Sequence, residues 1–125
     1  MLQQASPSKH IRAAYLFYYA CDAAFQVDSE SSTDSAARHH EHYQQRLQAL
    51  MHDMLVLAKQ MDFHVFNALT VMDNSLFLQQ QKFEPGDSPL HFYVFNWRTA
   101  MVPNGMDDQM RADPSSPGGI GAVML

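Results

Sequence analysis

The clearest pattern in the chain is an apolar stripe between residues 47 and 61. Apolar side chains recur there every three or four positions, which is the spacing of one face of an α-helix. The members of the stripe are Leu47, Leu50, Met51, Met54, Leu55, Ala58 and Met61. The pattern therefore predicts a helix over about residues 35–61, with its first turns largely polar.

Four other stretches have the composition of β-strands. Residues 11–20 and 63–70 are rich in aromatic and apolar side chains, and the second stretch alternates large and polar residues. Residues 90–97 combine aromatic and β-branched residues and are the clearest predicted strand. Residues 118–125 end the chain on an apolar run, which predicts a short strand docked in a core.

The remaining segments read as a short helix, a turn and two loops. Residues 74–81 predict a short helix with Asn74 as its N-cap, and the Pro- and Gly-containing residues 85–89 predict a tight turn. Residues 25–35 and 101–119 predict loops. The resulting order of strands and helices is typical of an α/β or α+β layered domain.

Composition narrows the class of protein. A chain of 125 residues suits one domain, and a net charge of −5 argues against a nucleic-acid partner. No apolar run approaches the ~20 residues that span a bilayer, and the start lacks the pattern of a signal peptide. One cysteine excludes an internal disulfide and fits a reducing compartment. We therefore expect a cytoplasmic protein without a transmembrane segment.

A histidine cluster in the predicted helix invites a metal-site hypothesis. His39 and His42 are three positions apart, so on a helix they are neighbours, and His40 lies between them. The spacing is not that of His-Glu-x-x-His, and no further ligand follows at a suggestive distance. A solvated polar helix face is the better interpretation, and no metal site is predicted.

Two further candidates favour structural roles on their chemistry alone. Cys21 lies in an apolar stretch beside Asp22, whose charge disfavours a thiolate, so a buried structural thiol is expected. Asp87 lies between Gly86 and Ser88 in the predicted turn, where it either completes the turn or offers an exposed carboxylate.

The last residue raises a question of charge. If Leu125 is docked in a core, its α-carboxylate is buried with it, and a buried anion is costly without a cationic partner. The simpler alternative is that the tail packs while its carboxylate reaches water.

Five stretches, in this order, resemble the C-terminal half of N-myristoyltransferase. Residues 9–18 (K-H-I-R-A-A-Y-L-F-Y) are similar to the family's H-K-x-L-x-A-A-Y-x-F-Y, and residues 63–69 (F-H-V-F-N-A-L) to its F-D-V-F-N-A-L. Residues 82–88 (K-F-E-P-G-D-S) resemble K-F-G-x-G-D-G, and residues 90–97 (L-H-F-Y-V-F-N-W) resemble L-x-Y-Y-L-Y-N-W. Residues 121–125 match the family's apolar C-terminus. Short motifs in a fixed order make this resemblance specific.

The resemblance implies an acetyltransferase-like (acyl-CoA N-acyltransferase) fold, in which a mixed sheet is flanked by helices. Residues 1–125 would be a partial domain of it, the C-terminal peptide-binding half truncated on its N-terminal side, and residues 21–46 an insertion or loop region. The family's enzyme transfers myristate from myristoyl-CoA to the N-terminal glycine of proteins. Its other half binds myristoyl-CoA, so no cofactor is expected on this chain, and the expected partners are N-terminal glycine peptides and proteins.

The resemblance also implies roles for five residues. The carboxylate of Leu125 would be the catalytic base that takes a proton from the glycine ammonium of the substrate. Tyr15 and Leu90 would line the peptide groove, and Asn67 would lie near its glycine end. Asp87 would face a basic residue further along the substrate peptide.

The chain departs from the family pattern at two positions of the turn. Glu84 and Ser88 replace glycines, and they strain the turn if those positions need a positive φ. The chain alone, without the acyl-CoA half, is expected to be inactive. The alternative hypothesis is therefore a non-catalytic remnant or a peptide-binding module.

Overall fold

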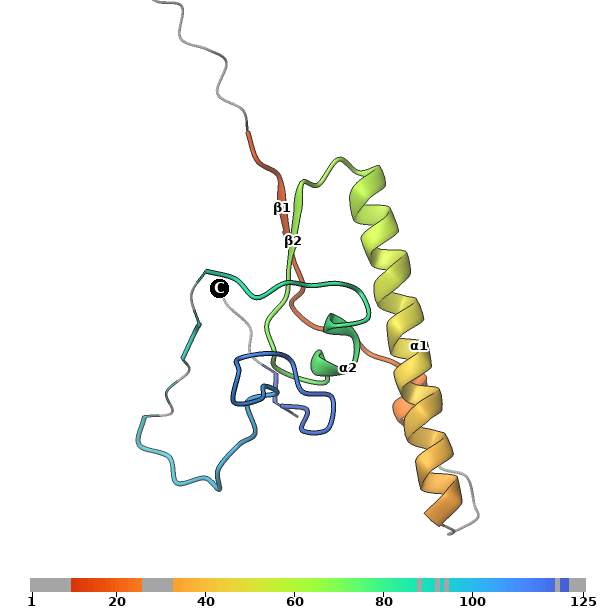
Figure 1. The fold of residues 1–125 in the computed structure, drawn as a ribbon, viewed down its shortest axis with the longest axis vertical. Coiled ribbons are helices and arrows are strands. Elements are labelled where there is room, and N and C mark those ends of the chain that lie inside the picture. Colours follow the sequence, from red (N-terminus) through yellow and green to blue (C-terminus); the bar gives the residue numbers. More distant parts are fainter. Residues whose placement is uncertain are drawn as a thin grey trace, which may run out of the picture.

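A small parallel sheet and one long helix organise the fold. The computed structural model describes residues 10–25, 33–87, 89–91, 93, 95–118 and 120–121. Its elements are β1 (Ala13–Tyr15), a 3₁₀ helix η1 (Asp22–Ala24), α1 (Thr33–Gln60), β2 (Val65–Asn67) and α2 (Ser75–Leu78). β1 and β2 lie side by side, α1 runs along one flank, and the irregular segments after α2 lie on the opposite flank (Figure 1).

The two strands pair in parallel, with α1 in the connection between them. Ala13 is in register with Val65, and Tyr15 with Asn67. Parallel strands need a long crossover, and a helix is the usual solution. The α/β class is thus as predicted, and the sheet in the described residues consists of two parallel strands, so the mixed sheet that the resemblance implies is not confirmed.

Hydrogen bonds just outside β1 and β2 hold the two strands together at both ends. The backbone N–H of His64 donates to the carbonyl oxygen of Arg12 at 2.9 Å, and the N–H of Arg12 donates to Nδ1 of His64 at 3.0 Å. At the other end, the N–H of Leu16 donates to the oxygen of Asn67 at 2.8 Å. The pairing therefore extends one residue beyond the strands on each side.

The long helix is confirmed, and it buries only part of its apolar stripe. Leu47, Met51 and Ala58 are buried, whereas Leu50 and Met61 are exposed. The segments packed against α1 come from one side, where η1 and α2 contact it. The stripe is therefore wider than the surface that covers it.

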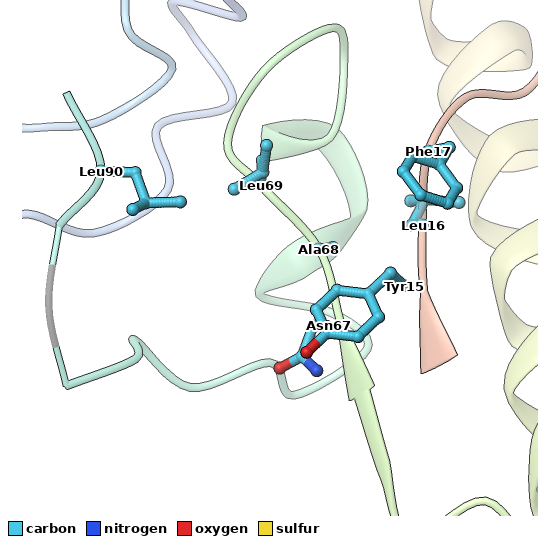
Figure 2. Close-up of a pocket in the computed structure, with 7 residues that line it drawn as sticks. All are labelled: Tyr15, Leu16, Phe17, Asn67, Ala68, Leu69 and Leu90. Carbon is cyan, nitrogen blue, oxygen red and sulfur yellow. The ribbon is translucent and has the colours of Figure 1, made fainter. Parts of the chain in front are cut away.

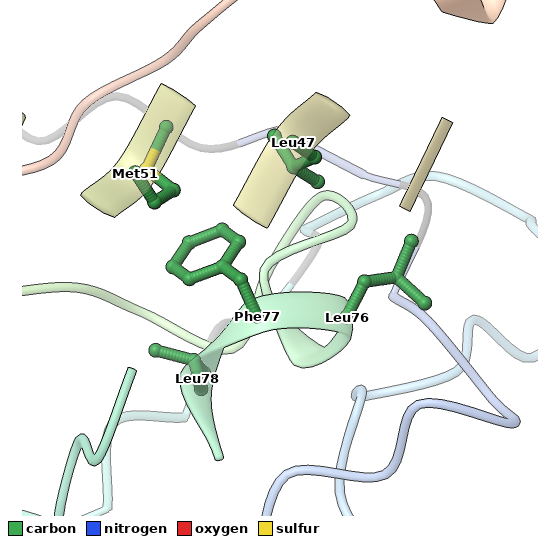
Figure 3. Packing of buried hydrophobic residues seen from close by; sticks show 5 residues of the cluster. All are labelled: Leu47, Met51, Leu76, Phe77 and Leu78. Carbon is green, nitrogen blue, oxygen red and sulfur yellow. The ribbon is translucent and has the colours of Figure 1, made fainter. Parts of the chain in front are cut away.

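The core lies between α1 and α2. Leu47 and Met51 of α1 face Leu76, Phe77 and Leu78 of α2, and the ring of Phe77 points between Leu47 and Met51 (Figure 3). Phe77 has no exposed surface. Fully burying a phenylalanine side chain contributes roughly 1.5–3 kcal/mol, so this contact is a main source of stability.

Glutamine side chains tie the short helix to the long one. The Nε2 atoms of Gln44 and Gln48 donate to the carbonyl oxygen of Leu76 at 3.3 and 3.1 Å. The predicted helix over 74–81 is shorter in the structure and ends at Leu78. Asn74 is the N-cap residue of this helix as predicted, but its side chain forms no cap hydrogen bond and instead donates from Nδ2 to the carbonyl oxygen of Leu69 at 2.8 Å.

The predicted strand over 90–97 is wrong for its described residues. None of them is in a strand, and Tyr93, Phe95 and Trp97 are 89%, 90% and 77% exposed. A strand needs a neighbouring backbone to satisfy its polar groups. Among the described residues, no strand lies beside this segment.

The strands predicted over 11–20 and 63–70 are present but contract to three residues each. Only these central residues pair in a regular ladder, with single backbone hydrogen bonds at its two ends. Of the aromatic residues that follow β1, Phe17 and Tyr18 are exposed, whereas Tyr19 packs against the core.

The later segments are irregular. Residues 101–118 form the predicted loop, with one isolated bridge between Met106 and Ala112. In the terminal run, Gly118, Ile120 and Gly121 are described and are not in a strand, and its other residues lie outside the described part.

Two expectations concern segments before and along α1. Of the region 21–46, residues 33–46 are helical and form the first half of α1. Of the predicted loop 25–35, residues 26–32 lie outside the described part. No helix in the described ranges is long and apolar enough to cross a membrane.

Candidate functional site

An open pocket of about 220 Å³ lies where both strands of the sheet end (Figure 2). Its lining is mainly apolar, with one amide and one phenol among the side chains. The lining residues are Tyr15, Leu16, Phe17, Asn67, Ala68, Leu69 and Leu90.

Parallel pairing explains why these residues meet. The carboxyl ends of parallel strands lie at the same edge of a sheet, and crevices there are common ligand sites in α/β folds. Tyr15 and Asn67 are the last residues of β1 and β2 and are paired with each other. The chain after each strand adds the next pocket residues, and the segment after the turn adds Leu90 from the opposite wall (Figure 2).

The pocket brings together three of the five residues singled out from the sequence. Tyr15, Asn67 and Leu90 all line it, although Leu90 is 23 positions away from Asn67. Two further lining residues, Phe17 and Leu69, were not among the residues singled out from the sequence. Their positions just after the two strands are the signal that predicts them once parallel pairing is known.

The lining suits a peptide better than a charged ligand. The Asn67 amide both donates and accepts hydrogen bonds, as a peptide backbone does, while the leucines and aromatic rings suit an apolar side chain. None of the described lining residues is a lysine, arginine, aspartate or glutamate. The described lining therefore offers an apolar surface and two neutral polar side chains, and no charge, to any molecule that enters it.

Asp87 does not line the pocket. It is exposed, three positions before Leu90, on the turn that leads into the pocket wall. Its carboxylate is therefore available to a cation that extends beyond the pocket. Glu84 does not adopt a positive φ, so the strain considered for that position does not arise, and Ser88 lies outside the described residues.

Leu125 also lies outside the described residues. The last described residue before it is Gly121. The carbonyl oxygen of Ile120, one position earlier, accepts a 2.6 Å hydrogen bond from the N–H of Met72. Met72 follows the pocket residue Leu69 by three positions. The described end of the chain is therefore attached close to the pocket wall.

The metal and thiol candidates gain no support. In the described ranges, no group of three or more His, Cys, Asp or Glu residues is arranged to hold a metal ion. His40 and His42 are exposed and His39 is half-buried, which fits a polar helix face. Cys21 is a free thiol and is half-buried rather than fully buried.

A polar cluster of Tyr19, Tyr43 and Asp73 joins α1 to the segment before α2. The hydroxyl of Tyr43 donates to Oδ2 of Asp73 at 2.7 Å. Burial and the charge of Asp73 raise the pKa of Tyr19 above its ordinary value. Burial and the hydrogen bond to Asp73 raise the pKa of Tyr43 as well. Both hydroxyls therefore stay protonated at neutral pH, and the cluster acts as a structural tie.

Comparison with protein families gives one match over almost the whole chain. The family is described as "Myristoyl-CoA:protein N-myristoyltransferase, C-terminal domain", and residues 1–123 match it.

Individual relatives agree with this match. A glycylpeptide N-tetradecanoyltransferase of Aspergillus fumigatus is 47% identical over 116 residues, which cover 93% of this chain and 21% of that protein. One from Schizosaccharomyces pombe is 41% identical and covers 94% of this chain and 24% of that protein. This chain thus spans between a fifth and a quarter of these two relatives.

Solved structures resemble the fold as well. A Saccharomyces cerevisiae N-myristoyltransferase with bound myristoyl-CoA has a TM-score of 0.80 and 36% identity to this chain. The similarity covers 99% of this chain and 27% of that one.

Proposed function

Since the chain belongs to the family of the C-terminal domain of myristoyl-CoA:protein N-myristoyltransferase, we propose that it forms the peptide-binding part of such an acyltransferase. The substrate is the N-terminal glycine of a peptide or protein, and the acyl donor is myristoyl-CoA. The α-carboxylate of Leu125 is the proposed base.

One observation carries the proposal: Tyr15, Asn67 and Leu90, which the family resemblance implies as peptide-contacting residues, line a single pocket. They come from three segments far apart in the sequence. The apolar walls and the Asn67 amide suit an extended peptide, and Asp87 offers a carboxylate further along.

The proposed chemistry is a proton transfer followed by acyl transfer. A free α-carboxylate has a pKa near ~3.5 and a peptide ammonium one near ~8, so in water the carboxylate is a weak base for that proton. Removal from water disfavours both charged forms, because it raises the pKa of the carboxyl group and lowers that of the ammonium group. Binding in the site also fixes the geometry of the two groups, so the proton transfer becomes feasible. The freed amine forms its bond to the thioester carbonyl carbon, the C–S bond breaks, and CoA leaves as the thiol after it takes up a proton.

The acyl donor is proposed to bind outside this chain. Phosphates of a CoA are usually held by arginine, lysine or helix N-termini. The described pocket lining has no basic residue, and the solved relative with bound myristoyl-CoA is almost four times as long as its matched part. This chain therefore supplies the acceptor side of the reaction.

Peptide titration tests the acceptor role. The isotope-labelled chain is titrated with a peptide that begins with a free glycine and carries a lysine further along, and the Asn67 side-chain amide is followed by NMR. We expect saturable shifts at Asn67 and weaker binding of the same peptide with an acetylated glycine. Absence of shifts at Asn67 would overturn the proposal.

Extension of the C-terminus tests the base. In the complete enzyme, two residues added after Leu125 move the carboxylate and are expected to abolish acyl transfer while peptide binding persists. Full turnover by the extended enzyme would exclude Leu125 as the base. Peptide binding without turnover by the unextended enzyme would favour a non-catalytic peptide-binding module.

A further inference from the structure

We infer that Gly105 and Gly118 are positioning residues, which clamp the backbone at Thr70 and so fix the terminal segment relative to the pocket wall. The inference rests on the proposed function, because it concerns how the pocket and the end of the chain are held together. The three residues Gly105, Gly118 and Thr70 are called the glycine clamp below.

Gly105 can hold its place only as a glycine. Its φ is +69°, a conformation that residues with a Cβ rarely adopt. A Cβ built on Gly105 comes closer than 3.0 Å to the carbonyl oxygen of Thr70. The obstacle is backbone, so a side chain here displaces one of the two segments.

Gly118 closes the clamp from a second direction. It is buried, and a Cβ on it lies 3.2 Å from the oxygen of Thr70 and 3.5 Å from that of Met72. Within the loop, the N–H of Asp113 donates to the carbonyl oxygen of Gly105 at 2.9 Å. Two residues of the loop that lack a side chain, Gly105 and Gly118, thus lie against the carbonyl oxygen of Thr70.

The clamp leads directly to the end of the chain. Two residues after Gly118, the oxygen of Ile120 accepts the 2.6 Å hydrogen bond from the N–H of Met72. Met72 itself has a φ of 57°, which is unfavourable for a methionine and persists only because its surroundings hold it. A Cβ built on Gly121 would lie 3.7 Å from Cγ of Met72, which is an ordinary van der Waals contact.

The clamped segment is fixed on its other side as well. The Asp73 carboxylate accepts the hydrogen bond from Tyr43 of α1, and the Asn74 side chain donates to the oxygen of Leu69. Leu69 lines the pocket. A shift at Thr70 therefore moves a pocket wall and the attachment of the terminal segment together.

Chain lengths make this coupling relevant to the reaction. Met72 is three positions after Leu69, a span of at most about 11 Å, and Leu125 is four positions after Gly121, at most about 14 Å. The terminal carboxylate is thus tethered by a short piece of chain to a point that the clamp fixes near the pocket.

Hydrogen exchange tests the clamp without any need for catalysis. In Gly105→Ala, we expect the amide of Met72 to exchange at least tenfold faster than in the unmodified chain. Gly118→Ala is the milder variant, because its contact of 3.2 Å leaves more room. The control is Gly86→Ala, because Gly86 is exposed and a Cβ there meets nothing within 4 Å. Unchanged exchange at Met72 in both clamp variants would overturn the inference.

A second readout separates positioning from stability. The carboxyl carbon of Leu125 is labelled with ¹³C, and its resonance is followed during titration with the free-glycine peptide. We expect a peptide-dependent shift in the unmodified chain and in Gly86→Ala, and its loss in Gly105→Ala while the helical circular dichroism is kept. A retained carboxyl shift in Gly105→Ala would contradict the positioning role.

The two readouts distinguish the inference from the proposed function. If the chemical shift of the Leu125 carboxyl carbon in the unmodified chain does not change on addition of the peptide, then the proposed role of Leu125 is excluded. The exchange rate of Met72 then decides alone whether the glycine clamp holds the terminal segment.

Discussion

The hydroxyl of Tyr43 donates a 2.7 Å hydrogen bond to the carboxylate of Asp73, thirty positions further along the chain. Tyr43 belongs to α1, and Asp73 ends the segment that begins with the pocket residue Leu69. The bond therefore connects the core helix to the wall of the candidate site. Removal of this hydrogen bond is expected to affect both the packing of α1 and the position of that wall.

Removal of this hydroxyl should destabilise the fold. Tyr43→Phe leaves the part-buried Asp73 carboxylate without a charge-assisted hydrogen bond, so the free energy of unfolding should fall by about 1.5 kcal/mol. Urea denaturation measures this change. The matched control is Tyr93→Phe, because Tyr93 is almost fully exposed and its substitution should leave the midpoint unchanged. An equal effect of both variants would contradict the prediction.

Alkaline pH should weaken the fold through the same cluster. Burial and the nearby Asp73 raise the pKa of Tyr19, so the folded state binds this proton more tightly than the unfolded state does. Such a group contributes its full stability below the unfolded pKa near ~10 and loses it as the pH rises further. Urea midpoints measured between pH 8 and 11.5 should thus be flat at first and then fall.

The variant Tyr19→Phe tests the source of that decline. It removes the titrating hydroxyl, which lies beside Asp73 without forming a well-oriented hydrogen bond, so its midpoint should fall less steeply above pH 10. The exposed Tyr93→Phe should keep the full decline. The same slope for all three proteins would rule out a contribution from Tyr19.

Truncation of Phe77 should lower the free energy of unfolding strongly, whereas truncation of Phe95 should leave it almost unchanged. Phe77 has no exposed surface and contacts the rings of Tyr19 and Phe83, so Phe77→Ala should cost about 3–5 kcal/mol. Phe95 is 90% exposed, so Phe95→Ala should change the free energy of unfolding by less than about 0.5 kcal/mol. Thermal denaturation decides between them, and a large loss for Phe95→Ala would contradict the exposed position of residues 95–97.

Asp87 should contribute modestly to the recognition of a basic peptide. An exposed ion pair is worth about 0.2–1 kcal/mol, so Asp87→Asn should weaken binding of the lysine-containing peptide by a factor of about 1.4 to 5. The difference should shrink in high salt. Isothermal titration measures both effects, with Asp108→Asn as the control because Asp108 is an exposed acid that does not line the pocket. A similar loss for a peptide without lysine would exclude a charge contact.

Local patterns predicted the helices better than the strands. The stripe from Leu47 to Ala58 specifies α1 because all its information lies within a few turns of chain. Asn74 shows the limit even of local patterns. It is the N-cap residue of α2, but its Oδ1 caps no N–H of the helix, and its Nδ2 donates to the carbonyl oxygen of Leu69. Both outcomes depend on the path of the backbone, which the pattern does not contain.

Strand prediction failed where the partner is not local. Residues 90–97 have strong β-propensity, but propensity describes a side chain's fit to a sheet and does not supply the neighbouring strand. Among the described residues no such neighbour is present. By contrast, Ala13–Tyr15 pairs because residues 65–67 reach it through the crossover.

The candidate site was predicted by resemblance more than by pattern. The strand patterns over residues 11–20 and 90–97 assign no site role to Tyr15 or Leu90, and only the family resemblance implies that they line a peptide groove. Their convergence with Asn67 in one pocket depends on parallel pairing and on the path of the turn before Leu90. Neither is encoded in any single stretch of sequence.

The register of β1 with β2 has a consequence for the order of folding. Ala13 and Val65 are 52 positions apart, so the sheet can form only after a long loop closes, at an entropic cost of about 3.5 kcal/mol. Three residue pairs return little of that cost, whereas the turns of α1 form within about a microsecond from contacts between near neighbours. Helix formation and its packing against Phe77 therefore come first, and strand pairing sets the slow step. The pocket, which exists only where the paired strands end, is thus among the last features of the molecule to appear as it folds.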